Sequence, residues 1–303
     1  MSNNYWIVDE WLIFKPKFNE ELTYYYGIIN KYKKIIFSNY NNPLIAIETN
    51  NQHEIEHCVN FIKNQFSKEI DLSNNVNLTH LTFGWYFNQK ISLSNNINLT
   101  HLTFGISFNQ EISLSNNINL THLTFGWFFN QKINLLNNIN LTHLTFGFCF
   151  NQEIDLSNNI NLTHLTFGWN FNQEIYLLNN INLTHLTFGK HFNKKINIPL
   201  NITSLNMLQC NNQYIIDNLH NNIKELNIYK TNLNLNNLPN SIKKLYINEY
   251  NEELNNLPNS IEYLELTNYK LKIRKIPKNL KTIKCDEKYK YIDDFENCNV
   301  IYH

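Results

Sequence analysis

The sequence predicts a repeat solenoid, mainly β, in which about eleven short rungs stack to form a parallel sheet on the concave side, with little helix and capped ends. Three observations predict this fold. The string LTHLTFG occurs six times, and successive copies are 21 residues apart. Each copy is followed by FNQ or FNK, a charged residue and isoleucine. After the sixth copy, the same apolar spacing continues in five less regular rungs.

Each LTHLTFG string has the alternation of a β-strand. In the first copy, Leu81 and Phe83 share one face of the strand, whereas His80 and Thr82 share the other. A single strand cannot bury Leu81 and Phe83. We therefore expect successive rungs to stack in parallel, about 4.8 Å apart, and to seal a shared apolar interior.

The return path of each rung is short, because a rung has only 19 to 21 residues. We expect extended segments or short 3₁₀ turns there instead of helices. Apolar residues of this path, Ile97 among them, are expected to cover the core. Gly84 is expected to permit a turn whose backbone conformation other residues resist.

The five rungs after His185 keep the apolar spacing of the earlier strands, and four of them follow an Ile-Pro or Leu-Pro step. Their strands are predicted at Ile202/Leu205/Met207, Ile223/Leu226/Ile228, Ile242/Leu245/Ile247, Ile261/Leu264/Leu266 and Leu280/Ile283/Cys285.

The ends of the array differ from its middle. Residues 1–65 are predicted to form an N-terminal cap of short strands plus a helix near 51–66, residues 66–285 the solenoid, and residues 286–303 a C-terminal cap. The runs expected as N-terminal strands are Trp6–Phe14, Tyr24–Ile29, Ile35–Phe37 and Leu44–Ile47. A separate partner-docking module is the alternative interpretation of residues 1–65.

Charge and composition exclude several classes of function. Lys+Arg and Asp+Glu both number 25, so no excess of basic residues indicates a nucleic acid or an anionic membrane as partner. No apolar run is long enough to cross a bilayer. The five cysteines are scattered, and no basic leader precedes an apolar run. These features predict an intracellular protein of the cytoplasm.

The repeated pattern L-x-x-L-x-F-G-x-x-F-N-Q-x-I resembles the FNIP repeat, a leucine-rich-repeat-like unit of amoeboid and giant-virus proteins. The resemblance covers roughly residues 66–285 and implies a leucine-rich-repeat-like stack. If the chain is viral, its site of action would be the host cytoplasm. Some members of the family carry an N-terminal F-box that recruits a ubiquitin ligase. Residues 1–65 have no F-box pattern, so that activity is not carried over.

A column of identical histidines is expected to point outward from the sheet. Its members are His80, His101, His122, His143, His164 and His185. One hypothesis is metal binding by adjacent imidazoles, and the other is a solvent-facing polar ladder. Repulsion between stacked imidazolium groups should lower their pKa values, and we expect the face to become cationic below about pH 6.

Other columns are expected to support the stack. Asn88, Asn96 and their copies should bond from one rung to the next. One column of charged residues nearly alternates in sign, which favours in-register stacking: Glu69, Lys90, Glu111, Lys132, Glu153, Glu174 and Lys195. The aromatic residues that follow the glycine, such as Trp85 and Trp127, either cover the core edge or form an exposed rim.

The outward positions of the later rungs are more diverse and suit selective recognition, although an ordinary solvated face is the alternative. The candidate contact residues are Glu225, Lys244, Tyr246, Tyr263 and Glu265. No nucleophile elbow, phosphate-binding loop or HExxH motif occurs, so we expect no catalytic residues, no cofactor and no enzymatic activity.

The function predicted from these features is a non-catalytic scaffold that binds a protein partner on the concave face, a host protein if the chain is viral. One alternative is a substrate receptor of a ubiquitin ligase with a diverged N-terminus that binds the adaptor. A second alternative is metal binding on the histidine column.

Overall fold

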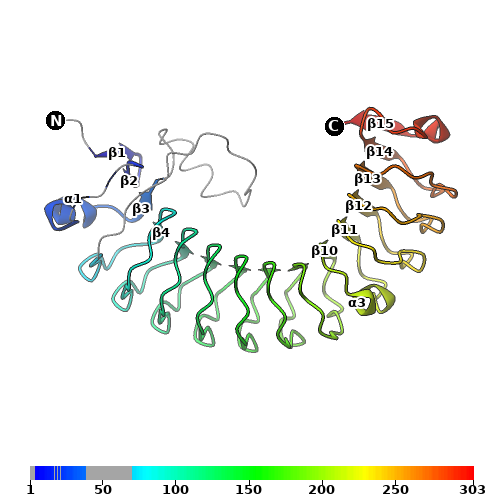
Figure 1. The fold of residues 1–303 in the computed structure, drawn as a ribbon. Coiled ribbons are helices and arrows are strands. Elements are labelled where there is room, and N and C mark those ends of the chain that lie inside the picture. Colours follow the sequence, from blue (N-terminus) through cyan, green and yellow to red (C-terminus); the bar gives the residue numbers. More distant parts are fainter. Residues whose placement is uncertain (1–3, 17, 19, 21, 39–69) are drawn as a thin grey trace. The chain divides into compact units, whose positions relative to one another are not determined.

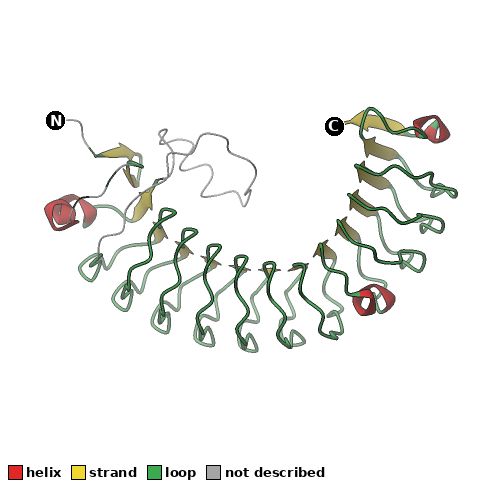
Figure 2. Cartoon of the chain, viewed as in Figure 1, coloured by secondary structure: helices red, strands yellow, loops and turns green. Residues whose placement is uncertain are grey.

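The computed structural model describes residues 4–16, 18, 20, 22–38 and 70–303, and the chain divides into two compact units, Met1–Leu162 and Thr163–His303. Strands stack along the chain, with few helices among the described residues (Figures 1 and 2). The predicted helix near 51–66 and the predicted strand Leu44–Ile47 lie outside the described residues.

The first unit is a sheet of seven described strands that follow one another in chain order. They are β1 (Tyr5–Val8), β2 (Trp11–Phe14), β3 (Lys34–Phe37), β4 (His80–Thr82), β5 (His101–Thr103), β6 (His122–Thr124) and β7 (His143–Thr145). β1 pairs with β2 in antiparallel fashion, and β2 to β7 are parallel. The parallel sheet therefore includes two strands from the segment that the sequence assigned to the N-terminal cap.

A short helical segment connects β2 to β3. It consists of η1 (Leu22–Tyr25) and α1 (Tyr26–Ile29), so the strand predicted at Tyr24–Ile29 is wrong. The run is apolar enough for a strand, but only Ile29 of α1 is buried. Because β2 and β3 are parallel, the chain must cross back between them, and the helical turn makes this crossing.

The second unit is a parallel sheet of eight described strands. They are β8 (His164–Thr166), β9 (His185–Phe188), β10 (Ser204–Leu208), β11 (Glu225–Tyr229), β12 (Lys244–Asn248), β13 (Tyr263–Thr267), β14 (Thr282–Cys285) and β15 (Asn299–Tyr302). The helical segments are α3 (Gln213–Asp217) and η2 (Ile292–Phe295). All eleven predicted strands, β4 to β14, are present.

The register places identical residues of successive rungs side by side. In the first unit Leu81 pairs with Leu102, and Leu102 with Leu123. Phe83 and Phe104 lie in parallel stacks in the interior, with ring centroids 5.3 Å apart. The shared apolar interior that the repeat predicts is thus confirmed in this unit.

One side chain of the predicted interior is outside it. Ile97 is 51% exposed, and Val76, Ile118, Ile139 and Ile160 are exposed in the same way. The neighbouring Asn96 takes the interior position, because its amide bonds to backbone carbonyls inside the turn. The expectation that Ile97 covers the core is therefore wrong.

The repeated glycine is required for close packing and not for an unusual backbone angle. No described glycine has a positive φ. A Cβ at Gly126 would lie 2.0 Å from the carbonyl oxygen of Gly105, one rung earlier. The expected role of Gly84 and its copies in permitting a turn is corrected accordingly: only glycine lets successive rungs approach this closely at that position.

Candidate interaction surfaces on the sheet

The five candidate contact residues lie together on the outward face of β11, β12 and β13 in the second unit. We call this set, Glu225, Lys244, Tyr246, Tyr263 and Glu265, the tyrosine face. The register pairs Glu225 with Lys244 and Lys244 with Tyr263, and it pairs Tyr246 with Glu265. The sequence therefore located neighbouring residues correctly, although their binding role stays a prediction.

Contacts between rungs hold these side chains in place. Lys244 Nζ lies 3.3 Å from Glu225 Oε2, and the Tyr263 hydroxyl donates to Glu265 Oε2 at 2.8 Å. The rings of Tyr246 and Tyr263 are 5.5 Å apart between centroids and are tilted by 47°. The two tyrosines thus form one half-buried aromatic patch between charged groups.

Burial and hydrogen bonding determine the ionisation of this patch. Burial raises the pKa of Tyr246, and burial together with the hydrogen bond to Glu265 raises the pKa of Tyr263. The hydrogen bond to Glu225 raises the pKa of Lys244. Both phenols therefore remain protonated at neutral pH. Tyr246 can present its O–H group to a partner, whereas the Tyr263 hydroxyl, which donates to Glu265, can offer its oxygen as an acceptor.

Sequence reasoning missed the cations beside the tyrosine face. Lys284 Nζ lies 3.4 Å from Glu265 Oε1, and Glu262 lies between Lys243 at 2.8 Å and Lys281 at 2.6 Å. Hydrogen bonds from these two lysines lower the pKa of Glu262 to about 2. The 19-residue spacing of these rungs was the available signal, because it places residues 243, 262 and 281 in one column.

The histidine column is a ladder of stacked rings in each unit. In the first unit, ring centroids are 4.2 Å apart between His80 and His101, 4.2 Å between His101 and His122, and 4.3 Å between His122 and His143. In the second unit His164 and His185 are 4.1 Å apart. The predicted outward position of these side chains is confirmed.

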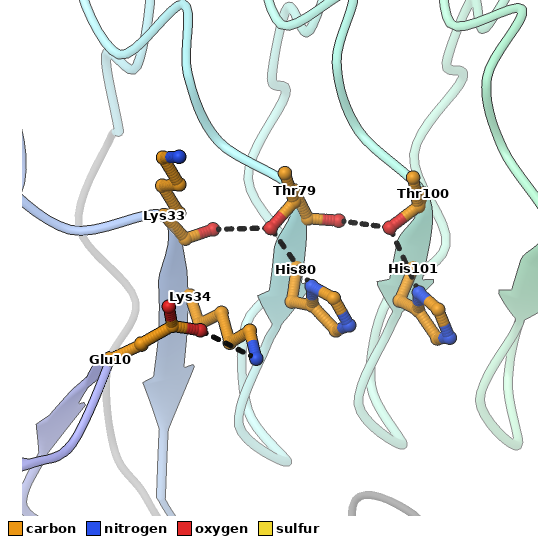
Figure 3. A network of polar contacts seen from close by, with 7 residues as sticks. All are labelled: Glu10, Lys33, Lys34, Thr79, His80, Thr100 and His101. Atoms are coloured by element: carbon orange, nitrogen blue, oxygen red, sulfur yellow. Dashed lines mark hydrogen bonds and ion pairs between the residues drawn. The ribbon is translucent and has the colours of Figure 1, made fainter.

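Threonines bind the histidine rings to the backbone (Figure 3). Thr79 Oγ1 lies 2.9 Å from His80 Nδ1 and 3.2 Å from the carbonyl oxygen of Lys33. Thr100 Oγ1 makes the same two contacts, at 2.9 Å to His101 Nδ1 and 3.0 Å to the Thr79 carbonyl. Figure 3 shows that the second nitrogen of both rings points away from the threonine.

His80 and His101 are less basic than the sequence predicts. Burial is the main cause that lowers the pKa of His80 and of His101 to about 4, and nearby positive charges add to it. His80 and His101 therefore become cationic near pH 4 and not near the expected pH 6. Repulsion between histidines contributes, but it is smaller than desolvation.

The other columns support the stack in different ways. Asn88 Oδ1 accepts from the backbone N–H of Asn109 at 2.8 Å, as predicted for bonding between rungs.

The charged column lacks the expected contact at one step, because no ion pair within 4.0 Å joins Glu111 to Lys132 in the described structure. Trp127 is 41% exposed and stacks on Phe148 at 4.3 Å, so the aromatic column is an exposed rim at this point.

No group of three or more His, Cys, Asp or Glu residues in the described part of the chain is arranged to hold a metal ion. The stacked geometry gives the reason: parallel rings direct their lone pairs side by side and not toward one point. Among the described helices, none combines the length and apolar character that a membrane span requires.

Comparison with known proteins agrees with this architecture, which is that of a leucine-rich-repeat-like solenoid. Residues 229–269 match the FNIP Repeat family. The chain therefore carries FNIP-repeat sequence, and the match lies in the less regular rungs, including β12 and β13 of the tyrosine face. No curated protein sequence matches the chain.

Solved structures share the fold. CroV588 of a giant virus, described as a novel circular LRR protein, is 28% identical with a TM-score of 0.58; the match covers 99% of this chain and 54% of that one. The chain thus spans about half the length of CroV588. An internalin, InlF of Listeria monocytogenes, is 22% identical with a TM-score of 0.50, covering 78% of this chain and 77% of that one. This second likeness concerns the fold alone.

Proposed function

We propose that the chain is a non-catalytic scaffold that binds a protein partner through the tyrosine face. Leucine-rich-repeat-like folds commonly serve as protein-interaction scaffolds. The observation that carries the proposal is the aromatic patch of Tyr246 and Tyr263, which lies between the Glu225–Lys244 and Glu265–Lys284 pairs.

This arrangement suits recognition for physical reasons. Tyrosines provide large contact area with little loss of conformational entropy, and they retain a hydrogen-bonding group. The hydrogen bond from Tyr263 to Glu265 already fixes one ring before a partner arrives. Charges at the rim of such a patch mainly determine how a partner is oriented and which partner binds, and they contribute less to the affinity of the complex.

The partner would be a host protein and the site of action the host cytoplasm if the chain is viral, as its likeness to CroV588 supports. The substrate-receptor alternative requires adaptor binding by residues 1–65. No feature of the described part of that segment favours it, since β2 and β3 are strands of the same parallel sheet.

The test is affinity capture with the full chain and two variants, followed by mass spectrometry. We expect a protein that the wild type enriches to be lost when Tyr246→Ala and Tyr263→Ala are combined. The matched control is Tyr176→Ala, because Tyr176 is a 78% exposed tyrosine of the same unit outside the strands. Equal enrichment by the double variant, or no enrichment by the wild type, would contradict the proposal.

A further inference from the structure

A row of apolar side chains lies exposed in the turns that precede the strands of the first unit. We call Val76, Ile97, Ile118 and Ile139 the isoleucine ridge, and each is between 48% and 51% exposed. Ile160 continues the row at 46%. Contact with water costs free energy in proportion to apolar area, and the ridge repeats this cost in four successive rungs. A contiguous apolar surface of this kind is typical of a binding site.

Hydrogen bonds between rungs fix the period of the ridge. The side-chain amide of Asn98 donates to the Val76 carbonyl, one rung earlier, at 3.0 Å. The next two rungs repeat this bond at 2.9 Å, from Asn119 to Ile97 and from Asn140 to Ile118. The four ridge residues are thus tied to one another at the rung spacing of about 4.8 Å, before any partner arrives.

Asparagine amides border the ridge, before and after its residue in each turn. The amides that precede it also bond to the previous rung, at 3.2 to 3.3 Å: Asn95 to the Ser73 carbonyl, Asn116 to Ser94 and Asn137 to Ser115. Each such bond uses one N–H, whereas an amide has two N–H donors and an oxygen that accepts. Amides therefore complement other amides, so the border of the ridge is complementary to an identical border.

The turns that carry the ridge have no charged residue. Their sequences are SNNVN at 73–77, SNNIN at 94–98 and 115–119, and LNNIN at 136–140. Two such surfaces can therefore approach each other without electrostatic repulsion, which is the requirement for a surface that binds its own copy.

The regular period indicates that the partner is a second copy of the chain. Side chains at a close-packed contact interdigitate, so each isoleucine fits between two side chains of the opposite surface. A second ridge has the same period and fills these gaps in all four rungs. A two-fold rotation reverses its direction and brings Ile97 and Ile118 of both copies to the centre of the contact.

The area suits a weak dimer. Four half-exposed aliphatic side chains and their bordering asparagines on each copy give a contact on the order of 1,000 Å² in total, which is near the lower limit for a specific interface. Such a contact is reversible, and its strength depends on the isoleucines at its centre.

We propose that the isoleucine ridge joins two copies of the chain in a two-fold symmetric dimer. The ridge belongs to the first unit, so this self-association does not depend on the protein-binding role proposed for the tyrosine face of the second unit.

The test is sedimentation equilibrium of the full chain at pH 7 over a range of concentrations. We expect the average mass to rise from one chain toward two, with a dissociation constant on the order of 10 μM. Ile118→Lys places like charges at the centre of the contact and should weaken dimerisation at least about tenfold. The matched control is Phe128→Lys, which changes a 49% exposed apolar residue outside the ridge and should leave the dissociation constant unchanged.

A mixing experiment excludes misfolding as the cause of a loss. Ile118→Glu alone should dimerise as weakly as Ile118→Lys, whereas an equimolar mixture of the two should regain dimers, because opposite charges then meet across the two-fold axis. The chain with both Tyr246→Ala and Tyr263→Ala should dimerise as the wild type does, which separates this proposal from the function of the tyrosine face.

Several results would overturn the dimer. They are a wild-type mass of one chain at every concentration, unchanged dimerisation of Ile118→Lys, an equal loss in Phe128→Lys, and a mixture of the Lys and Glu variants that stays monomeric. A different protein as the occupant of the ridge would leave the purified chain monomeric, and this outcome would therefore also contradict the proposal.

Discussion

The side-chain amide of Asn117 donates to the backbone carbonyl of Asn96, the equivalent residue one rung earlier, at a distance of 2.9 Å. The same amide donates to the carbonyl of Leu93 at 3.0 Å. Asn117 and Asn96 are fully buried. A column of interior asparagines therefore gives a second donor to carbonyls that already accept from the backbone N–H groups of Asn96 and Leu99, and it links each rung to the next.

Asn117→Ala should destabilise the first unit by about 3 kcal/mol, because two buried hydrogen bonds between rungs are lost and a small cavity forms. The measurement is urea unfolding followed by circular dichroism. The control is Asn119→Ala, whose amide bonds to the Ile97 carbonyl at 2.9 Å on the exposed surface. We expect the control to cost less than about 1 kcal/mol, and equal losses would contradict the role of the interior column.

Gly126→Ala should be among the most destabilising single-methyl changes in the chain, costing more than about 3 kcal/mol. The added Cβ would lie 2.0 Å from the Gly105 carbonyl oxygen, and backbone of the neighbouring rung would have to move. Gly27→Ala is the matched control, since nothing lies within 4 Å of its Cβ position and Gly27 is in a helix. There alanine should be neutral or stabilising by up to about 1 kcal/mol. Similar melting temperatures for the two variants would refute the close-packing explanation.

Much of the fold could be predicted because identical rungs leave one consistent register. Leu81 has an identical neighbour in the next rung, so periodicity alone located the strands and the outward histidines. The strands β2 and β3 could not be assigned to the same sheet, because their apolar residues such as Phe14 and Phe37 lack the repeated string. Their stacked rings, 5.0 Å apart, reveal the connection only in three dimensions.

Other features depend on backbone geometry that the sequence does not contain. Composition predicts burial of Ile97, but the turn places Asn96 inside and Ile97 outside. A repeated glycine is compatible with a left-handed turn or with close packing of neighbouring rungs. Only the distance from its Cβ position to the backbone of the neighbouring rung distinguishes these two roles. At the tyrosine face the shared column of Lys244 and Tyr263 followed from 19-residue spacing, whereas the hydrogen bond from Tyr263 to Glu265 depends on rotamers.

Gln209→Gly should stabilise the second unit by about 0.5 kcal/mol. Gln209 follows β10 with a φ of 56°, a left-handed conformation that costs a non-glycine residue about 1–2 kcal/mol. Part of the gain is offset by the entropy that glycine loses on folding. Gln209→Ala removes the same side chain but keeps the strained φ, so it should give no gain. Thermal unfolding of both variants provides the comparison, and a stabilising alanine would show that the side chain and not the backbone is responsible.

Stability should fall as the pH is lowered from about 6.5 to about 4, because of the histidine column. The pKa of His80 and of His101 is about 4 in the folded chain, against 6.5 for an ordinary histidine. Between these values the unfolded state binds more protons than the folded state, so protonation favours unfolding; below about pH 4 both states are protonated and this contribution stops changing. Both rings are partly exposed, so solvent screening reduces the loss to about 1 kcal/mol per histidine.

Urea midpoints at pH 7, 6, 5 and 4 measure this effect. Carboxylates also titrate toward the acid end, so the informative quantity is the difference between the wild type and the chain carrying His80→Phe and His101→Phe. The variant should lose less stability over this range, and His191→Phe should behave as the wild type does. Identical pH profiles for all three chains would mean that protonation of His80 and His101 is not coupled to unfolding.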